Sequence, residues 1–189
     1  DDDAFHEFLL NEVINICHLE GTNKEIVAHL DLQELVKSYY HVMAIAEQVR
    51  QKNPISLYQI LMQSRPITLE GLEDPERLKE IVESINHQVG CVDDTEHKIQ
   101  VLAREGQIDI EITGISGVVH TVHIDQGFIQ SPSYQQIEKV ANLAYPLFAE
   151  ECIVKLKEER TITKTLGQAV EMVMESGKKG YNVQRYKGL

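Results

Sequence analysis

The sequence has no tryptophan, and its three cysteines, Cys17, Cys91 and Cys152, are far apart and odd in number. This spacing argues against a disulfide framework or a cysteine-ligated metal site, and it favours buried thiols in a reducing cytoplasm. No apolar run approaches the ~20 residues that a membrane span needs, and no signal peptide is visible. The sequence therefore predicts a cytoplasmic protein that does not contact a membrane.

Patterns that carry enzymatic chemistry are also missing. There is no glycine-rich loop to hold a phosphate, so ATP binding is not expected. Ser131 and Ser133 lack the Gly-x-Ser-x-Gly turn of an activated serine. His120 and His123 are expected on opposite faces of a strand, which disfavours a shared metal ion. His97 could approach His123 across strands, but no acid at a fixed spacing accompanies the pair. We therefore predict no catalytic residue, no metal site and no cofactor in this chain.

Charge is unevenly distributed. The net charge is −12, and residues 177–189 carry four cations and no acid, namely Lys178, Lys179, Arg185 and Lys187. The other 176 residues therefore carry −16. Because DNA binding depends on Lys and Arg replacing the counterions of phosphate, so acidic a body should be repelled by a duplex. Any DNA contact is expected at the C-terminal end, and we interpret the acidic body as a solvated surface.

The chain begins with an acidic stretch. Residues 1–10 place acids in a first turn and apolar residues at helical spacing, which predicts a short helix. Asp1, Asp2 and Asp3 would point in different directions on that helix, which disfavours a metal cluster. Residues 13–19 alternate loosely, as an edge strand would.

Helical periodicity continues through the first half of the chain. Asp31 is expected to cap a helix that runs to Lys52. Pro54 then fits the first turn of a short second helix, which Arg65-Pro66 stops. Asp74-Pro75 should start a third helix, with Asp as the cap and Pro at the first helical position.

The middle of the chain changes to a two-residue period. Residues 98–102, 108–112 and 118–124 alternate or are rich in β-branched residues, and short glycine-containing turns separate them. Consecutive strands with short turns predict an antiparallel meander. Three isoleucines of the second strand are expected to face the core, namely Ile108, Ile110 and Ile112, while Asp109 and Glu111 face water.

The next stretch returns to helices. Ser131-Pro132 should open a helix that ends near Ala149. Residues 153–163 fit a hairpin or a strand. Thr165 and Gln168 form a capping-box pair for a final helix with a regular apolar face.

The last ten residues complete the predicted fold. Gly180 is expected to end the final helix, residues 181–186 to form a strand, and residues 187–189 to begin a turn. The predicted fold class is α+β, with a helical N-terminal half, an antiparallel β-meander in the middle, and C-terminal helices followed by a final strand.

The run Gln184-Arg-Tyr-Lys-Gly-Leu189 resembles the segment that opens the final part of the magnesium-binding (TOPRIM) domain in the B subunit of DNA gyrase. In that family the motif continues Gly-Glu-Met-Asn, which this sequence lacks. Asp1-Asp2-Asp3-Ala4 is similar to the acidic helix start that precedes the motif in the family. Some Gram-negative gyrases carry a large insertion between these points, and Ile67-Thr-Leu-Glu70, residues 117–124 and Phe128-Ile129 resemble it.

This resemblance implies a division of the chain. Residues 1–11 and 161–189 would belong to the TOPRIM domain, and residues 12–160 would form the insert domain. The insert would be a non-catalytic part of an ATP-dependent type IIA topoisomerase that supports negative supercoiling. Its partners would be the gyrase A subunit, the rest of the B subunit, and DNA in the A2B2 complex. Mg²⁺ and ATP would act elsewhere in the intact enzyme.

The resemblance also suggests a role for the basic end. Arg185 and Lys187 flank Tyr186, so a strand would send both charges to one side and the ring to the other. The motif match favours contacts to DNA phosphate from these residues, with Lys178 and Lys179 nearby. An ordinary edge strand with solvated charges is the simpler reading for an isolated domain.

Three alternatives to the insert hypothesis remain open from the residues alone. The first is an acidic protein-interaction module whose partner is unknown. The second is an independent DNA-binding module, which the −16 body disfavours. The third is a small cytosolic enzyme, for which no convergent acid, base or nucleophile is visible.

Overall fold

The computed structural model describes residues 2–188, and the expectations for Asp1 and Leu189 lie outside the described residues. The helices are α1 (Asp2–Val13), α2 (His29–Gln48), α3 (Ile55–Met62), α4 (Leu69–Glu73), α5 (Pro75–Cys91), α6 (Gln126–Ile129), α7 (Pro132–Phe148) and α8 (Leu166–Tyr186). The strands are β1 (Cys17–Gly21), β2 (Ile26–Val27), β3 (Lys98–Arg104), β4 (Gln107–Thr113), β5 (Val119–Ile124), β6 (Cys152–Leu156) and β7 (Glu159–Thr163). The predicted α+β class is confirmed.

Side-chain caps start the helices where the sequence predicts them. Asp74 accepts a hydrogen bond from the N–H of Glu76, with Pro75 at the first helical position. Ser131 caps α7 in the same way, and Thr165 accepts from the N–H of Gln168 to start α8. Each cap satisfies a backbone donor that the first helical turn leaves without a partner.

The cap predicted for the long second helix is wrong. Asp31 lies inside the first turn of α2, and the N-cap position is Ala28, which provides no side-chain hydrogen bond. The helix begins earlier because β2 ends at Val27, and the chain turns directly into α2 through His29, whose φ is 52°. Asp31 still lies near the positive end of the helix dipole, where an acid is favourable.

The three-stranded sheet has the order β3-β4-β5 and is antiparallel throughout, which confirms the meander. Ile110 of the central strand pairs with Val101 on one side and Val122 on the other. The three isoleucines of β4 are buried, as predicted: Ile108, Ile110 and Ile112.

The four-stranded sheet has the order β2-β1-β6-β7, again antiparallel. Residues 153–163, for which a hairpin or a strand was expected, form a hairpin of β6 and β7. The edge strand predicted for residues 13–19 is wrong in its residue range and in its place in the sheet. β1 begins at Cys17 and is internal, because β6 supplies a second neighbour from more than a hundred residues further along the chain.

A buried hydrogen bond fixes the segment that carries the Ile67-Thr-Leu-Glu70 resemblance. The N–H of Ile67 donates to the hydroxyl of Tyr134 on α7 at 2.7 Å, and burial raises the pKa of that phenol. Thr68 then caps α4 by accepting from the N–H of Gly71 at 2.9 Å. The motif therefore has a packing role at the junction of α4 and α7.

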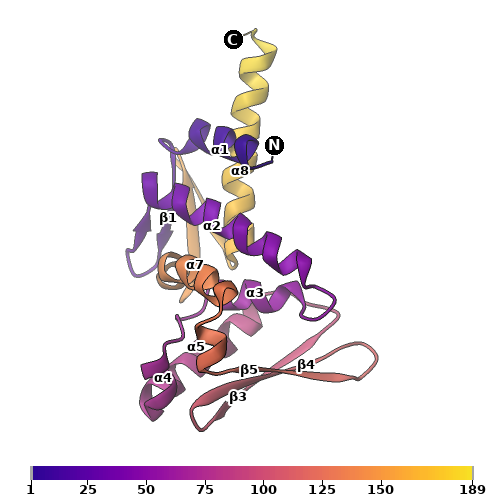
Figure 1. The fold of residues 1–189 in the computed structure, drawn as a ribbon. Coiled ribbons are helices and arrows are strands. Elements are labelled where there is room, and N and C mark those ends of the chain that lie inside the picture. The colour runs from indigo at the N-terminus through magenta and orange to yellow at the C-terminus, as the bar shows by residue number, and fades with distance from the viewer. Residues whose placement is uncertain (1, 189) are drawn as a thin grey trace.

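The strand predicted for Tyr181–Tyr186 is wrong, because these residues continue α8 as far as Tyr186. Within residues 2–188, no strand lies alongside this segment, and a helix satisfies its backbone groups internally. The positive φ typical of a helix-ending glycine occurs at Gly188, not at Gly180. Figure 1 shows α8 running up through the molecule past α1, so that its C-terminal end extends beyond the other elements.

Candidate functional site

The four cations singled out from the sequence lie on the C-terminal arm, which we define as residues 178–188. Lys178 and Arg185 are seven residues apart, close to two helical turns, so they share one side of α8. Lys179 lies about 100° further round the helix, and Lys187 is the C-cap residue. All four are exposed. The expected strand geometry, with Arg185 and Lys187 on one side, is therefore absent.

Most of these charges are available to a partner. Lys178 lies 3.4 Å from Glu175, one turn earlier on the same helix. In the part of the chain that the structure describes, Lys179, Arg185 and Lys187 make no ion pair. Tyr186, between two of them, is 92% exposed. Solvated cations beside an exposed ring are suited to phosphate contacts, which need no fixed partner in the free protein.

Close packing against α1 positions the arm. Gly177 lies against the backbone of Leu9, so closely that a Cβ atom on Gly177 would be 2.5 Å from the Leu9 carbonyl oxygen. One turn later, the Tyr181 ring meets Phe5 and Phe8 edge-on, with centroids 6.4 and 5.5 Å away. These contacts hold the base of the arm in a fixed direction.

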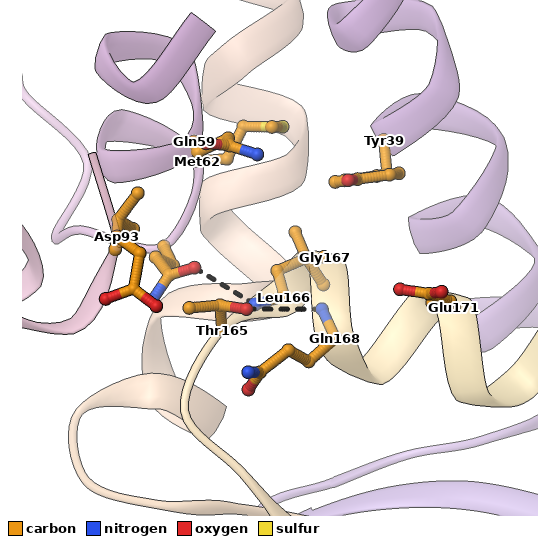
Figure 2. Close-up of a pocket in the computed structure, with 11 residues that line it drawn as sticks. Tyr39, Gln59, Met62, Asp93, Thr165, Leu166, Gly167, Gln168 and Glu171 are labelled. Carbon is orange, nitrogen blue, oxygen red and sulfur yellow. Dashed lines mark hydrogen bonds between the residues drawn. The ribbon is translucent and has the colours of Figure 1, made fainter. Parts of the chain in front are cut away.

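The other end of α8 lines a hollow of about 290 Å³. Figure 2 shows Thr165, Leu166 and Gly167 at the start of α8, Glu171 one turn further along the same helix, and Tyr39 on a neighbouring helix. The charged side chains of the lining are the two acids Asp93 and Glu171. Carboxylates repel phosphate, so the hollow is poorly suited to a nucleotide.

The hydroxyl of Tyr39 in this hollow does not act as a base at neutral pH. Burial, with smaller contributions from Tyr40 and Glu171, raises the pKa of Tyr39 to about 12. The phenol therefore stays protonated and packs beside the first turn of α8. A Cβ atom added to Gly167 would be 3.1 Å from the Tyr39 oxygen, so the two elements are close here.

Two buried glutamines join α8 to the body behind this hollow. Gln63 Oε1 accepts from the N–H of Leu166 at 3.0 Å, and Gln63 Nε2 donates to Gln88 Oε1 at 2.6 Å. Gln88 Nε2 in turn donates to the Phe148 carbonyl at 2.7 Å. Both glutamines are 1% exposed. This glutamine network links the end of α3, α5, the end of α7 and the start of α8.

The histidines are not gathered into a site. His120 contacts Asn53 at 3.1 Å, His123 contacts Asp109 at 2.8 Å, and His97 contacts Asp94 at 3.0 Å. Their partners are different and belong to different segments. Across residues 2–188, no group of three or more His, Cys, Asp and Glu side chains is placed to hold a metal ion.

Two of these acids have roles that the sequence did not reveal. Asp94 receives hydrogen bonds from Ser56, from the N–H groups of Glu96 and His97, and from the His97 ring. Partial burial would raise the pKa of Asp94, but these donors outweigh it and hold the pKa below its usual value. The Asp-x-x-His spacing of a capped turn was the available signal.

Asp109 is the second such acid. The ring of His123, the amide of Gln107 and the guanidinium of Arg104 surround its carboxylate. The hydrogen bond from His123 contributes most to a pKa below the ordinary value, and Gln107 and Arg104 act in the same direction. The acid was expected to face water, and it does so within this cluster on the open side of the meander.

The cysteines are partly as predicted. Cys17 and Cys152 are buried, and burial raises the pKa of the Cys17 thiol to about 11 and that of Cys152 to about 12. Cys91 is only half-buried, so the core position predicted for it is wrong. It lies in the last turn of α5, with its sulfur 3.9 Å from the His87 ring.

Fold and site together define a two-sheet α+β domain in which one long C-terminal helix carries exposed cations. None of the helices described for residues 2–188 combines the length and apolarity needed to cross a membrane. The chain belongs to the DNA gyrase B subunit insert domain family, whose model matches residues 19–177.

Curated relatives support this assignment over nearly the whole chain. The DNA gyrase B subunit of Rickettsia conorii is 24% identical over 189 residues, covering 98% of this chain and 23% of the relative. The type 2 topoisomerase B subunit of Aquifex aeolicus is 28% identical over 196 residues, covering 100% of this chain and 23% of the relative. The chain thus spans less than a quarter of the length of the relatives it matches.

Proposed function

We propose that this chain is the accessory insert region of a DNA gyrase B subunit, without catalytic activity of its own. In this proposal it supports ATP-dependent negative supercoiling in the cytoplasm by shaping how the B subunit, the A subunit and DNA fit together. The match to the insert family over residues 19–177 is the observation that carries the proposal. Mg²⁺ and ATP would act on other parts of the intact enzyme, and no step on this chain uses them.

The division at residues 11 and 160 remains a prediction, and the path of the chain is compatible with it. The N–H of Lys157 donates to the Ile16 carbonyl at 2.9 Å, so the chain enters and leaves the proposed insert at one place. α1, which leads into this place, packs against α8, as Figure 1 shows. A large insert can then be attached next to the packed pair of helices without disturbing the chain on either side of it.

α8 is proposed to act as a rigid connection between the insert and the DNA-proximal end. Its first turn is held by the glutamine network of the body, and its base at Gly177 is held by α1. From Leu166 to Gly177 the helix rises about 17 Å. Displacement of the body would therefore move the C-terminal arm, which is a direct way to couple insert position to DNA contact.

DNA contact is proposed for Arg185 and Lys187, with Lys178 and Lys179 in support. Their exposure and, for three of them, the lack of an ion pair within the described residues support this assignment. These side chains would hold phosphate without reading sequence. The isolated 189-residue chain should bind a duplex no more tightly than ~10⁻⁴ M at physiological salt, because the acidic body opposes binding.

A salt series on the intact gyrase tests the DNA contact. In Arg185→Ala/Lys187→Ala, the slope of log affinity against log salt should fall by ~0.9 for each lost phosphate contact. The matched control is Lys79→Ala/Lys139→Ala, which removes two exposed lysines of α5 and α7. The control should keep the parental slope. Equal slopes in the arm variant and the parent, with equal thermal melts, would mean that the arm cations do not touch phosphate.

A further inference from the structure

The four-stranded sheet has one face packed on helices and one face open to solvent. Cys17 and Leu19 of β1, with Cys152 and Val154 of β6, are buried on the inner side. Side chains alternate along a strand, and cross-strand partners share a face. The pairing registers therefore define an outer sheet face, which consists of His18, Glu20, Ile26, Ile153, Lys155, Arg160 and Ile162.

An aliphatic row crosses this outer sheet face. Ile153 and Ile162 are neighbours at one level on β6 and β7, and Glu20 of β1 lies between them and Ile26 on the edge strand β2. Ile26 is 57% exposed and Ile162 is 61% exposed. Isoleucines at this exposure cost free energy in water, and grouped apolar side chains with a polar rim mark interaction surfaces.

The one acid of the outer sheet face, Glu20, is paired with cationic and hydrogen-bonding side chains of the same face. Glu20 lies 2.6 Å from the His18 ring and 2.7 Å from the Arg160 guanidinium. The hydrogen bond from His18 is the largest cause of a pKa of Glu20 below the ordinary value, and Arg160 adds to it. The carboxylate therefore has little charge left to repel an incoming anion.

Uncompensated positive charge remains beside the aliphatic row. A hollow of about 410 Å³ borders the outer sheet face, and its titratable side chains include His18, His29, Lys155, Lys157 and one acid, Glu158. Within residues 2–188, neither lysine makes an ion pair. Two lysines and one glutamate give this hollow a formal net charge of +1, whereas the body as a whole carries −16.

We propose that the outer sheet face binds a protein segment of the gyrase assembly, outside this chain, that carries carboxylates next to aliphatic side chains. The isoleucine row would bury the aliphatic groups, and Lys155 and Lys157 would pair with the carboxylates. Complementary charge also speeds the encounter of such partners. The inference rests on the proposed function only for its setting in the assembled enzyme, and it is independent of the DNA contact of the arm.

A duplex fits this face less well than a protein segment. DNA affinity comes from many phosphate contacts by Lys and Arg, and this face and the hollow beside it offer, within the described residues, two lysines without an ion pair and a row of isoleucines. An aliphatic row gains nothing against a phosphate backbone. A protein segment can use both parts of the surface at once.

Site-directed photo-crosslinking in the assembled enzyme tests this inference. A benzoylphenylalanine replaces Ile162 in the intact B subunit, which is then assembled with the A subunit and DNA and irradiated. Mass spectrometry should map the product to a protein segment with Asp or Glu within a few positions of aliphatic residues. The matched control places the same photoreactive residue at Lys79, an exposed position of α5.

A second arm of the experiment tests the charges. Adding Lys155→Glu/Lys157→Glu should lower the crosslink yield about fivefold or more, the size expected for losing exposed ion pairs. Adding Lys139→Glu should leave the yield unchanged. Because reversed charges could disturb the sheet, Lys155→Gln/Lys157→Gln is run alongside and should give an intermediate yield with a parental melting temperature.

Several results would overturn the inference. Crosslinks to DNA, crosslinks to a segment without carboxylates, or a yield at position 162 no higher than at position 79 would each do so. The same samples are assayed for supercoiling. An active enzyme without the predicted crosslink removes this inference alone. If none of the insert variants loses supercoiling, that result counts against the proposed function.

Discussion

The carbonyl oxygen of Leu9 occupies the place where a side chain on Gly177 would begin, 2.5 Å from the position of a Cβ atom. α1 and α8 therefore cross in backbone contact, close to where the proposed insert joins its surroundings. Such an approach requires a residue without a side chain. The direction of the C-terminal arm depends on this crossing.

We expect Gly177→Ala to destabilise the 189-residue chain by about 1–3 kcal/mol, the usual cost of overpacking. The added methyl group meets backbone, which cannot rotate away, so α8 must shift from α1. Urea unfolding followed by circular dichroism measures the change.

Gly180→Ala is the matched control, because nothing lies within 4 Å of a Cβ atom at that position of the same helix. Alanine is a better helix former than glycine, so this variant should gain about 0.5–1 kcal/mol. Two changes of the same sign would contradict the close crossing at Leu9.

A second prediction concerns the glutamine network. Gln63→Ala leaves the Leu166 N–H and the Gln88 Oε1 atom without their buried partner, which should cost at least about 2 kcal/mol. Gln59→Ala, four residues earlier on α3, removes a half-buried amide that makes no hydrogen bond in the part of the chain described. It should change stability by less than about 0.5 kcal/mol. Equal effects in thermal melts would show that the network does not hold α8.

Thiol labelling tests the burial of the cysteines. Cys17 and Cys152, whose pKa values burial raises to about 11 and about 12, should react with iodoacetamide at about pH 8 only after unfolding. Cys91, half-buried on α5, should be labelled first in the native chain. Peptide mass spectrometry over a time course gives the order, and early labelling of Cys152 would contradict the packing of β6.

The turn at Asp94 should make stability depend on acid pH. The folded pKa of Asp94 lies below its ordinary value, so its stabilisation is fully present above the unfolded pKa and is lost as pH falls through the folded pKa. Asp94→Ala should therefore lower stability by about 1.5–3 kcal/mol at neutral pH, the range for hydrogen bonds to a charged group. Once the pH is below the folded pKa, the difference should shrink. Melting temperatures of both proteins from strongly acidic to neutral pH check this, and a difference independent of pH would contradict the charge-dependent role.

Local signals in the sequence predicted much of the fold. Asp74, Ser131 and Thr165 start their helices as expected, because capping uses atoms only two or three residues away. The isoleucines of β4 also lie inside as their alternation indicated. Such features depend on neighbours in the chain and need no knowledge of the tertiary fold.

Features that depend on distant partners were not predictable. β1 is internal because β6 pairs with it, and no local sequence pattern predicts a pairing partner so far along the chain. Residues 181–186 were expected to form a strand, but a strand needs a neighbouring strand to satisfy its backbone hydrogen bonds. A helix satisfies these bonds internally, and here it also packs Tyr181 against α1. The sequence identified the basic residues of the arm, but their arrangement in space could not be predicted without knowing that this segment is a helix and not a strand.

The most direct test of the proposed function is removal of the proposed insert from the intact B subunit. Residues 12–160 are replaced by a short linker. The linker and residues 161–165 must together span about 17 Å, from the place where α1 crosses α8 to the start of α8, and extended chain can reach that far. Supercoiling and ATP hydrolysis of the reassembled gyrase are then measured with the parent alongside. The proposed function predicts that ATP hydrolysis persists while the supercoiling rate falls. Supercoiling at the parental rate would contradict it, because the insert would then play no part in coupling the geometry of the enzyme to DNA.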